Sequence, residues 1–382
     1  MAIAFWILAG LTLYVYAGYP MGMMLLAIVA PRRHRADQAH TPRATVLIPA
    51  YNEQAMIAAK LDNTLALDYP PGQLEILVAS ESDDSTDAIV ASYAHRGVRL
   101  LSSDQRRGKA GNLARAVPHA TGEIVVFTDA NALVRSDAVR RLAAWFADLR
   151  VGAVSGWLVY QKSANEASGA AEEAYWDMEM ALKRAESAVG SLPGAIGSLF
   201  ALRRELYAPI SPTRGDDFEL PIAVIMQGYD SILEPGAVSH EPADGSYRAQ
   251  LRHKMRMIHT SLPSAVILFG RALVRGRALL ALQIASHKLL RWAAAAWLPA
   301  LAVLSFALWS DGPIYAAAAM AQTVIYGLAL AGGMMVMAGA APPAALNLPL
   351  YFVTVNLAAL GGMALSASGK QVRWHKRADR VV

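Results

Sequence analysis

The residues best suited to hold a metal ion end the hydrophobic stretch VVFTDAN, residues 125–131. Asp129 and Asn131 are two positions apart at the expected end of a strand, so both side chains can reach one ion. Oxygen ligands of this kind suit Mg2+ or Mn2+, with phosphate oxygens completing the coordination. A turn in which Asp and Asn make local hydrogen bonds has the same pattern. The stretch is therefore a candidate site for a metal ion and a diphosphate.

An acidic pair, Asp216 and Asp217, lies in GDDFELP, residues 215–221. Adjacent like charges raise the pKa of one of the two carboxyls, which suits a general base. The alternative is that the pair caps a helix through residues 220–226. We treat the pair as a candidate proton acceptor.

Two polar junctions follow expected strands and could line a nucleotide pocket. They are VLIPAYNE (46–53), with Pro49, Tyr51 and Glu53, and SESDDSTD (80–87), with Asp83. A carboxylate such as Asp83 can accept hydrogen bonds from a base N–H or from ribose hydroxyls. The alternatives are a capped helix start in the first segment and N-capping by Asp84 or Ser85 in the second. A cap needs only one of these residues, so both roles can hold.

Two basic segments could hold a diphosphate. They are RRGKAGN (106–112), with Arg107 and Lys109, and SYRAQLRHKMRM (246–257), with Gln250, Lys254 and Arg256. Gly108 and Gly111 permit close backbone approach to phosphate, although the Walker pattern is absent. The alternatives are a basic surface turn and a juxtamembrane patch that binds anionic lipid.

These motifs need a scaffold, and the sequence predicts a parallel α/β sheet. Short apolar runs rich in Val and Ile predict strands at 44–50, 75–80, 98–103 and 123–129. Helical stretches alternate with them at 53–67, 85–95 and 109–118. Such alternation is typical of a parallel sheet. Ligands bind beyond the carboxyl ends of its strands, where the polar clusters stand.

A longer helix is expected at residues 166–189. Tyr175, Met178, Leu182 and Ala185 recur there at helical spacing. This face could pack on the α/β domain or lie on a membrane surface.

The chain is too apolar for an ordinary soluble protein. Hydrophobic residues make up 55% of its 382 residues and charged residues 17%. Residues 2–30 carry no charge and are long enough to span a bilayer. A cleaved signal peptide is the alternative, but the segment lacks a basic n-region. The cations at 32–35 follow at once and predict that the next domain is cytoplasmic.

The last third of the chain predicts more membrane segments. Residues 258–291 suit interfacial helices with snorkelling cations, and spans are expected at 293–310, 313–338 and 346–367. One span before the cytoplasmic domain and three after it would leave the basic tail outside, against the positive-inside rule. Either one segment is re-entrant, or residues 262–290 cross, or the tail breaks the rule.

Composition also excludes some classes of function. The chain has no cysteine, which excludes disulfides, thiolate nucleophiles and cysteine-based metal sites. Its net charge is +5, but the cations adjoin apolar runs, which favours membrane lipids as a partner over nucleic acid.

The six motifs, in this order between membrane segments, resemble the processive-type family 2 glycosyltransferases of the GT-A fold. This family includes cellulose, hyaluronan and poly-N-acetylglucosamine synthases and bacterial lipid or polysaccharide glycosyltransferases. The resemblance covers roughly residues 44–260 and implies a Rossmann-like, mostly parallel sheet domain inserted between transmembrane helices. The expected layout is a transmembrane helix at 1–31, the GT-A domain at 41–257, interfacial helices at 258–291, transmembrane helices at 292–368 and a basic tail at 369–382.

The resemblance also implies roles for individual residues. Asp83 would contact the nucleobase or ribose, Lys109 would lie near the donor, and Asp217 would be the catalytic base. Asp129 and Asn131 would bind the metal ion and the diphosphate. The donor side would further include Pro49, Tyr51, Glu53, Arg107, Lys254 and Arg256. The acceptor side would include the segment from Gly194 to Gly197, Ser198, Asp216 and Gln250, with Ala201, Arg203 and Arg204 following.

Two departures from the family pattern stand out. Asn131 replaces the usual second aspartate, which implies weaker metal binding. Gln250 is present, but His253 and Lys254 stand where the polymer synthases have Arg-Trp. This weakens the case for a processive polymerase.

We therefore expect a multi-pass protein of the bacterial inner membrane that is an inverting glycosyltransferase. Its donor would be a UDP- or GDP-sugar, its cofactor Mg2+ or Mn2+, and its acceptor a lipid or a glycan. The alternatives are a processive polysaccharide synthase that translocates its product, a nucleotidyl- or phosphotransferase, and a non-catalytic nucleotide-binding membrane scaffold.

Overall fold

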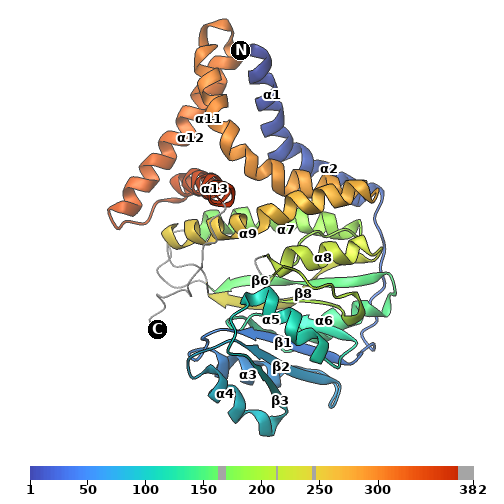
Figure 1. The fold of residues 1–382 in the computed structure, drawn as a ribbon. Coiled ribbons are helices and arrows are strands. Elements are labelled where there is room, and N and C mark those ends of the chain that lie inside the picture. Colours follow the sequence, from blue (N-terminus) through green and yellow to red (C-terminus); the bar gives the residue numbers. More distant parts are fainter. Residues whose placement is uncertain (162–168, 212–213, 243–246, 369–382) are drawn as a thin grey trace. The chain divides into compact units, whose positions relative to one another are not determined.

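The computed structural model of the chain describes residues 1–161, 169–211, 214–242 and 247–368 (Figure 1). Its contacts divide these residues into two compact units. The sheet unit comprises residues 29–161, 186–211 and 214–242. The helical unit comprises residues 1–28, 169–185 and 247–368.

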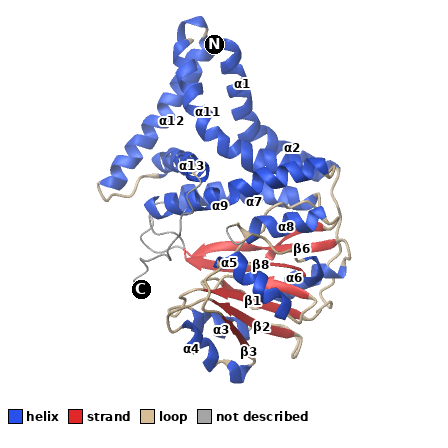
Figure 2. Cartoon of the chain, in the orientation of Figure 1, coloured by secondary structure: helices blue, strands red, loops and turns tan. Residues whose placement is uncertain are grey.

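An eight-stranded sheet forms the centre of the sheet unit (Figure 2). Its strands are β1 (Ala44–Ala50), β2 (Leu74–Ser80), β3 (Val98–Ser102), β4 (Ile124–Phe127), β5 (Leu133–Val134), β6 (Val151–Gln161), β7 (Phe200–Arg203) and β8 (Asp230–Pro242). Their order is β3-β2-β1-β4-β7-β6-β8-β5. The first four strands in this order are parallel, as is the β6–β8 pair, while β7 is antiparallel to both its neighbours and β5 to β8. The expected α/β fold is confirmed, and all four predicted strands are present.

The parallel part of the sheet is buried on both faces. Every residue of β1 is buried, because Val46 and Ile48 enter one hydrophobic cluster and Leu47 enters the other. Ala50 pairs with Ser80, and Leu47 with Phe127, so β1, β2 and β4 end at the same edge of the sheet. The loops that follow these strands carry the expected site residues.

Among the described residues, five α-helices lie wholly in the sheet unit, and the first three of them overlap the predicted stretches 53–67, 85–95 and 109–118. They are α3 (Ile57–Leu65), α4 (Thr86–Ser92), α5 (Gly108–Ala116), α6 (Ala138–Ala144) and α8 (Asp216–Met226). Short 3-10 turns lie at Ala94–Arg96, Val117–His119, Trp145–Ala147 and Arg204–Leu206. The helix predicted from residue 53 begins only at Ile57, because residues 51–56 form bends and turns.

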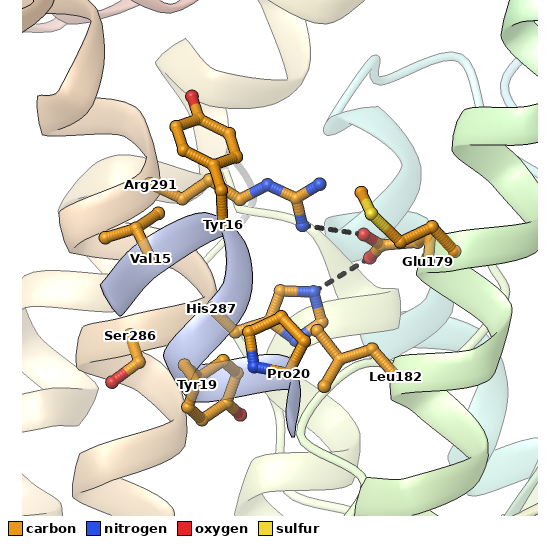
Figure 3. A pocket seen from close by; sticks show the side chains of 10 residues that line it. Val15, Tyr16, Tyr19, Pro20, Glu179, Leu182, Ser286, His287 and Arg291 are labelled. Atoms are coloured by element: carbon orange, nitrogen blue, oxygen red, sulfur yellow. Dashed lines mark hydrogen bonds and ion pairs between the residues drawn. The ribbon is translucent and has the colours of Figure 1, made fainter. Parts of the chain in front are cut away.

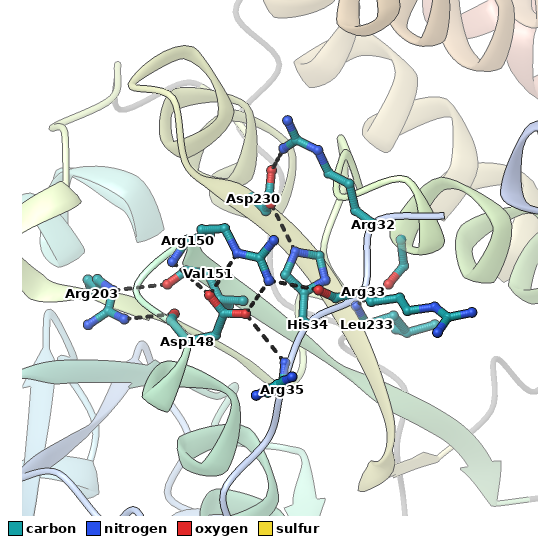
Figure 4. Close-up of polar contacts among 11 residues, drawn as sticks. Arg32, Arg33, His34, Arg35, Asp148, Arg150, Val151, Arg203, Asp230 and Leu233 are labelled. Atoms are coloured by element: carbon teal, nitrogen blue, oxygen red, sulfur yellow. Dashed lines mark hydrogen bonds and ion pairs between the residues drawn. The ribbon is translucent and has the colours of Figure 1, made fainter. Parts of the chain in front are cut away.

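The chain enters the sheet unit through a segment held by ion pairs (Figure 4). Asp230 binds both Arg32 and His34, the latter at 2.9 Å between Nε2 and Oδ2. The Arg150 guanidinium donates to the Arg33 carbonyl at 2.7 Å, and the Arg35 amide donates to an Asp148 carboxylate oxygen at 3.3 Å. These residues, predicted from their charge to flank a membrane, therefore also fix the start of the sheet unit.

The helical unit is built from helices of 6 to 28 residues (Figure 1). They are α1 (Ala2–Leu13), α2 (Tyr19–Val29), α7 (Gly169–Ala188), α9 (Tyr247–Val274), α10 (Ala278–Gln283), α11 (Leu290–Ala307), α12 (Pro313–Met337) and α13 (Ala344–Ala367). π-helical segments, Tyr14–Gly18 and Ile284–Leu289, join α1 to α2 and α10 to α11, and a 3-10 turn at Trp309–Asp311 follows α11. Helix α13 packs against α9, α11 and α12, and α1 packs against α11. The last residues of α2 and α7 belong to the sheet unit.

Within the described residues, five helical stretches are long and apolar enough to cross a membrane: 2–29, 247–274, 278–307, 313–337 and 344–367. The expected N-terminal span and the three expected C-terminal spans are among them. The expected boundary between residues 257 and 258 is not a break, because α9 runs through it. The stretch 258–291 is thus part of two long helices, whereas the tail at 369–382 lies outside the described residues.

The helix predicted at 166–189 is α7, although residues 166–168 lie outside the described residues. Its buried face differs from the predicted one: Met178 is exposed, whereas Glu179 is buried together with Leu182. Glu179 accepts hydrogen bonds from His287 and Arg291, both at 2.8 Å, beside a small pocket (Figure 3). An apolar pattern alone gave no reason to place this carboxylate inside.

Candidate functional site

A lysine shared by two carboxylates lies at the edge where the parallel strands end. The Lys109 Nζ is 2.8 Å from Asp129 Oδ1 and 3.1 Å from Asp216 Oδ2. Lys109 comes from the first turn of α5, Asp129 follows β4, and Asp216 begins α8. The lysine and Asp129 side chains are 36% and 32% exposed, whereas Asp216 is 6% exposed. Three separate motifs of the sequence thus meet in one cluster that solvent can reach.

The carboxylates of this cluster strongly affect its protonation. Burial of Lys109 disfavours its charged form, but Asp129 and Asp216 outweigh this effect and raise the lysine pKa. Burial raises the pKa of Asp216 to about 6, although Lys109 acts in the opposite direction, and Asp217 and Asp129 raise it further. The cluster therefore holds a fixed ammonium and a carboxyl that titrates above its usual range.

The acidic pair does not cap its helix. The N-cap residue of α8 is Gly215, and no side-chain hydrogen bond caps this helix within the described chain. Asp216 and Asp217 instead occupy the first turn, where the helix dipole stabilises negative charge. The capping alternative raised by the sequence is therefore wrong for this pair.

The expected acceptor segment lies against Asp217. The Ala195 amide donates to the Asp217 carbonyl at 2.8 Å. A Cβ atom at Gly197 would stand only 3.4 Å from Asp217 Oδ2, so any side chain there would lie directly on this carboxylate. Ser198 is buried, and its hydroxyl is hydrogen-bonded to the Ser239 hydroxyl at 2.8 Å. Gly197 thus keeps space beside the Asp217 carboxylate, whereas Ser198 is part of the interior.

Asp83 is held by a residue that was not among the predicted site residues. The Asn52 side-chain amide donates to Asp83 Oδ1 at 2.5 Å, and the Asp83 backbone amide donates back to Asn52 Oδ1 at 2.9 Å. Asn52 has a φ of 55°, the left-handed conformation that Asn tolerates better than most residues. The neighbouring Asp84 instead makes a local hydrogen bond, in which its Oδ1 accepts from the Thr86 backbone amide at 2.9 Å. An Asn two residues after a strand was the available signal.

The other residues of this first junction hold it together. Pro49 is buried within β1, and the Glu53 amide donates to the Thr86 hydroxyl at 2.8 Å. Arg106, also absent from the predicted set, lies over the Tyr51 ring at 3.9 Å from its centroid. Such stacking fixes a flat, positively charged surface beside the junction.

A buried acid that the sequence analysis missed organises the glycine-rich turn. One Glu81 carboxylate oxygen accepts from the backbone amides of Arg107 and Gly108, both at 3.0 Å. Burial raises the pKa of Glu81, although these two hydrogen bonds act against that shift. Its position one residue after β2 was the only signal, and the neighbouring aspartates masked it. Glu81 thereby positions the turn that carries Lys109.

Together these contacts place Asp83, Lys109, Asp129 and the acidic pair along one edge of the sheet unit. Asp83 follows β2 and Asp129 follows β4, and both strands flank β1 in parallel. Asp129 is joined to Asp216 through Lys109, with Asp217 next in sequence.

Three predicted residues come from the helical unit. Gln250, Lys254 and Arg256 lie on α9. Gln250 is buried, and the Lys254 Nζ lies 5.5 Å and 5.3 Å from the ring centroids of Tyr175 and Tyr351. The expected roles of Lys254 and Arg256 at the diphosphate and of Gln250 on the acceptor side remain predictions.

The metal-binding prediction was tested against the ligands that the chain offers. Across the described residues, no three His, Asp or Glu side chains gather as a metal site. Asp129 and Asn131 supply one carboxylate and one amide, and the Asp129 side chain is a third exposed. This pair fits a Mg2+ or Mn2+ ion only if a bound diphosphate supplies further oxygen ligands.

Comparison with known proteins gives the same picture of the sheet unit. Residues 45–210 match the family model described as "Glycosyl transferase family 2". A beta-monoglucosyldiacylglycerol synthase of Trichormus variabilis is 34% identical over 142 residues, which are 35% of this chain and 30% of that protein. An N-acetylglucosaminyltransferase of Azorhizobium caulinodans is 24% identical over 56% of this chain and 59% of its own length. The chain therefore spans under two thirds of either relative.

One solved structure is similar over nearly the whole chain. It is a mannosyltransferase of Pyrobaculum calidifontis in complex with GDP-Man and Mn2+. It matches with a TM-score of 0.73 and 28% identity, over 96% of this chain and 100% of that one. The similarity thus includes the helical unit as well as the sheet.

Proposed function

We propose that this chain is a family 2 glycosyltransferase that moves a hexosyl unit from a nucleoside-diphosphate sugar to a lipid or glycan acceptor. The observation that carries the proposal is the cluster of Lys109 with Asp129 and Asp216 at the ends of parallel strands. Ligands bind at this edge of α/β sheets, and a fixed ammonium there suits a diphosphate.

The proposed reaction is a single displacement with inversion. The acceptor hydroxyl oxygen forms a bond to the anomeric carbon while the bond from that carbon to the diphosphate oxygen breaks. The hydroxyl proton passes to Asp217, and the electron pair of the broken bond stays on the diphosphate. Lys109 stabilises the charge that the leaving diphosphate gains. One base is enough because only one proton moves.

Asp217 suits the role of base better than Asp216. Asp216 is buried and paired with Lys109. Asp217 is half-buried, and the missing side chain of Gly197 leaves space next to its carboxylate. A proton acceptor needs such space, because the acceptor hydroxyl must come within hydrogen-bonding distance.

The donor would lie along the strand ends. Asp83, held by Asn52, would accept from the ribose or the base, and Arg106 on Tyr51 would add positive charge nearby. A divalent ion held by Asp129, Asn131 and the diphosphate would supply further charge stabilisation when bound. The Pyrobaculum calidifontis relative was solved with GDP-Man and Mn2+, which supports a nucleotide sugar and a metal ion here.

The acceptor and the membrane side are also proposals. The Trichormus variabilis relative is named for a glycolipid product, which supports a lipid acceptor. If all five apolar helices cross, four crossings follow the sheet unit and return the chain to the same side. The cations after the first helix and those of the tail then both lie in the cytoplasm, which removes the conflict seen in the sequence.

A donor screen with the purified full-length chain tests this proposal. UDP- and GDP-hexoses are incubated with membrane lipid, with Mg2+, Mn2+ or EDTA, and the released nucleotide and the product are analysed. We expect a nucleoside diphosphate and a lipid carrying one sugar. Pyrophosphate release would indicate a nucleotidyltransferase, and a long product a processive synthase. Nucleotide binding without turnover of any donor would leave only the alternative of a non-catalytic nucleotide-binding membrane scaffold.

A further inference from the structure

Lys60 is a buried cation that the proposed reaction does not use. It lies on α3 and its side chain is fully buried. Its Nζ donates to the Thr128 hydroxyl at 2.8 Å and to the Ala132 carbonyl at 2.6 Å. Both acceptors belong to the loop that follows β4, on either side of Asp129 and Asn131.

One turn further along α3, Asn63 holds β5, the short strand that follows this loop. Its side-chain amide donates to the Val134 carbonyl at 2.9 Å, and the Val134 amide donates back to Asn63 Oδ1 at 2.9 Å. Inside the loop, the Ala132 amide donates to the Asp129 carbonyl at 3.2 Å. Residues three apart on a helix share a face, so α3 presents both side chains to the loop.

A lysine is a costly residue for this interior position. Burial lowers the pKa of Lys60 to about 7, although Asp129 and Glu241 act in the opposite direction. A Met or Leu would fill similar space without removing an ammonium from water. An apolar residue could not make the contacts of this lysine. Its Nζ donates to the Thr128 hydroxyl and to the Ala132 carbonyl, four residues apart, and so fixes the path of the chain between them.

We propose that Lys60 is a positioning residue. Through its two hydrogen bonds it holds the Thr128–Ala132 loop in a conformation in which Asp129 and Asn131 face the donor diphosphate. This rests on the proposed function, because it assigns that loop to the donor. Lys60 touches neither donor nor acceptor; it acts only through the loop.

Kinetics of matched variants test the proposal. Lys60→Met removes both hydrogen bonds at similar volume, and Thr128→Val removes one of their acceptors. Thr64→Val is the control, because this buried hydroxyl of α3 donates only to the Lys60 carbonyl within the helix, at 2.8 Å. We expect Lys60→Met to raise the donor KM and the Kd for UDP or GDP by about tenfold, with the acceptor KM unchanged. Thr64→Val should leave all three constants near those of the wild type.

The double variant Lys60→Met/Thr128→Val adds a test of mechanism. If both residues act through one hydrogen bond, the double variant's fold-increase in donor KM will be smaller than the product of the fold-increases of the two single variants. Equal donor KM values for Lys60→Met and Thr64→Val would overturn the inference while the proposed function stands. If Lys60→Met fails to fold, Thr128→Val decides alone, and an unchanged donor KM and nucleotide Kd would overturn it. If the wild type turns over no sugar nucleotide, the proposed function is refuted. The inference is then tested by nucleotide binding alone, and equal Kd values for Lys60→Met and Thr64→Val would overturn it.

Discussion

Two of the charge clusters among the described residues, one in each unit, have opposite composition. In the sheet unit, one cation, Lys109, is shared by the carboxylates of Asp129 and Asp216. In the helical unit, one carboxylate, Glu179, is shared by His287 and Arg291, and the Arg291 guanidinium also donates to the Tyr175 hydroxyl at 2.9 Å. Both clusters have contacts near 3 Å, so distance alone does not separate them.

Exposure and charge balance do separate them. The side chains of Glu179, His287 and Arg291 are 10%, 2% and 14% exposed, and both carboxylate oxygens of Glu179 have a partner. Lys109 and Asp129 are about a third exposed, and with Asp217 next in sequence the cluster has more carboxylates than cations. A closed cluster stabilises helix packing, whereas an open, negatively charged one can bind a cation and exchange a proton.

The largest effect should come from the proposed base. Asp217→Asn keeps the shape of the side chain and removes its proton affinity, so we expect kcat to fall by about 10^3-fold or more. The nucleotide Kd should change by less than about threefold, since Lys109 and Asp129 are intact. Steady-state kinetics and nucleotide titration measure both quantities. Turnover within a few-fold of the wild type would show that another group takes the proton.

The next effect should come from the shared cation. Lys109→Met removes the ammonium that would face the diphosphate and leaves Asp129 and Asp216 without it. We expect kcat/KM for the donor to fall by about 10^2-fold, through weaker donor binding as well as slower turnover. Lys109→Arg keeps the charge and should recover part of the loss. Equal values for Met and Arg would mean that charge at this position is not what matters.

In the closed cluster, a change should affect stability and spare chemistry. Glu179→Gln leaves His287 and Arg291 without their carboxylate, and breaking a buried pair costs about 3–5 kcal/mol. We expect a lower melting temperature in detergent, with kcat of the folded fraction within about twofold of the wild type. Met178→Leu, one residue away and exposed, is the control. A loss of kcat larger than the loss of folded protein would assign this cluster to function.

The sequence predicts the open cluster better than the closed one. The residues Lys109, Asp129 and Asp216 each stand at a strand end or helix start, where chain geometry decides their position before packing does. Glu179 stands in mid-helix beside Met178 and Met180, and only contacts between distant segments determine which of them is buried. The four parallel strands were predictable for the same local reason, whereas β6–β8, a long parallel pair, had no local signal.

Three of the residues that the sequence analysis missed share one property. Glu81, Asn52 and Lys60 each hold a loop rather than face a ligand, so their roles depend on where a second segment lies. Glu81 accepts hydrogen bonds from backbone amides of the turn that begins α5. Lys60 donates to a side-chain hydroxyl and a backbone carbonyl of the loop after β4. A single sequence does not state such pairings, because they join positions that are 26 to 72 residues apart.

The smallest effect should be a difference in pH dependence between the two clusters. Asp216 has a folded-state pKa of about 6, above its ordinary 3.8, so between about pH 4 and 6 the folded state holds a proton that the unfolded state has lost. The contribution of Asp216 to stability therefore falls as pH rises through this window, by at most about 3 kcal/mol. Burial by itself would raise the pKa of Glu179, but His287 and Arg291 lower it well below its usual range. The contribution of Glu179 therefore rises with pH as the unfolded carboxyl ionises.

Melting temperatures of wild type, Asp216→Asn and Glu179→Gln between pH 4 and 6 measure these slopes. The difference between Asp216→Asn and wild type should shift in favour of the variant as pH rises, because the variant has no carboxyl to ionise in the interior. The difference between Glu179→Gln and wild type should shift against the variant over the same range. Slopes of the same sign would mean that the two carboxyls sit in equivalent environments, and the distinction between an open and a closed cluster would then fail on its electrostatic side.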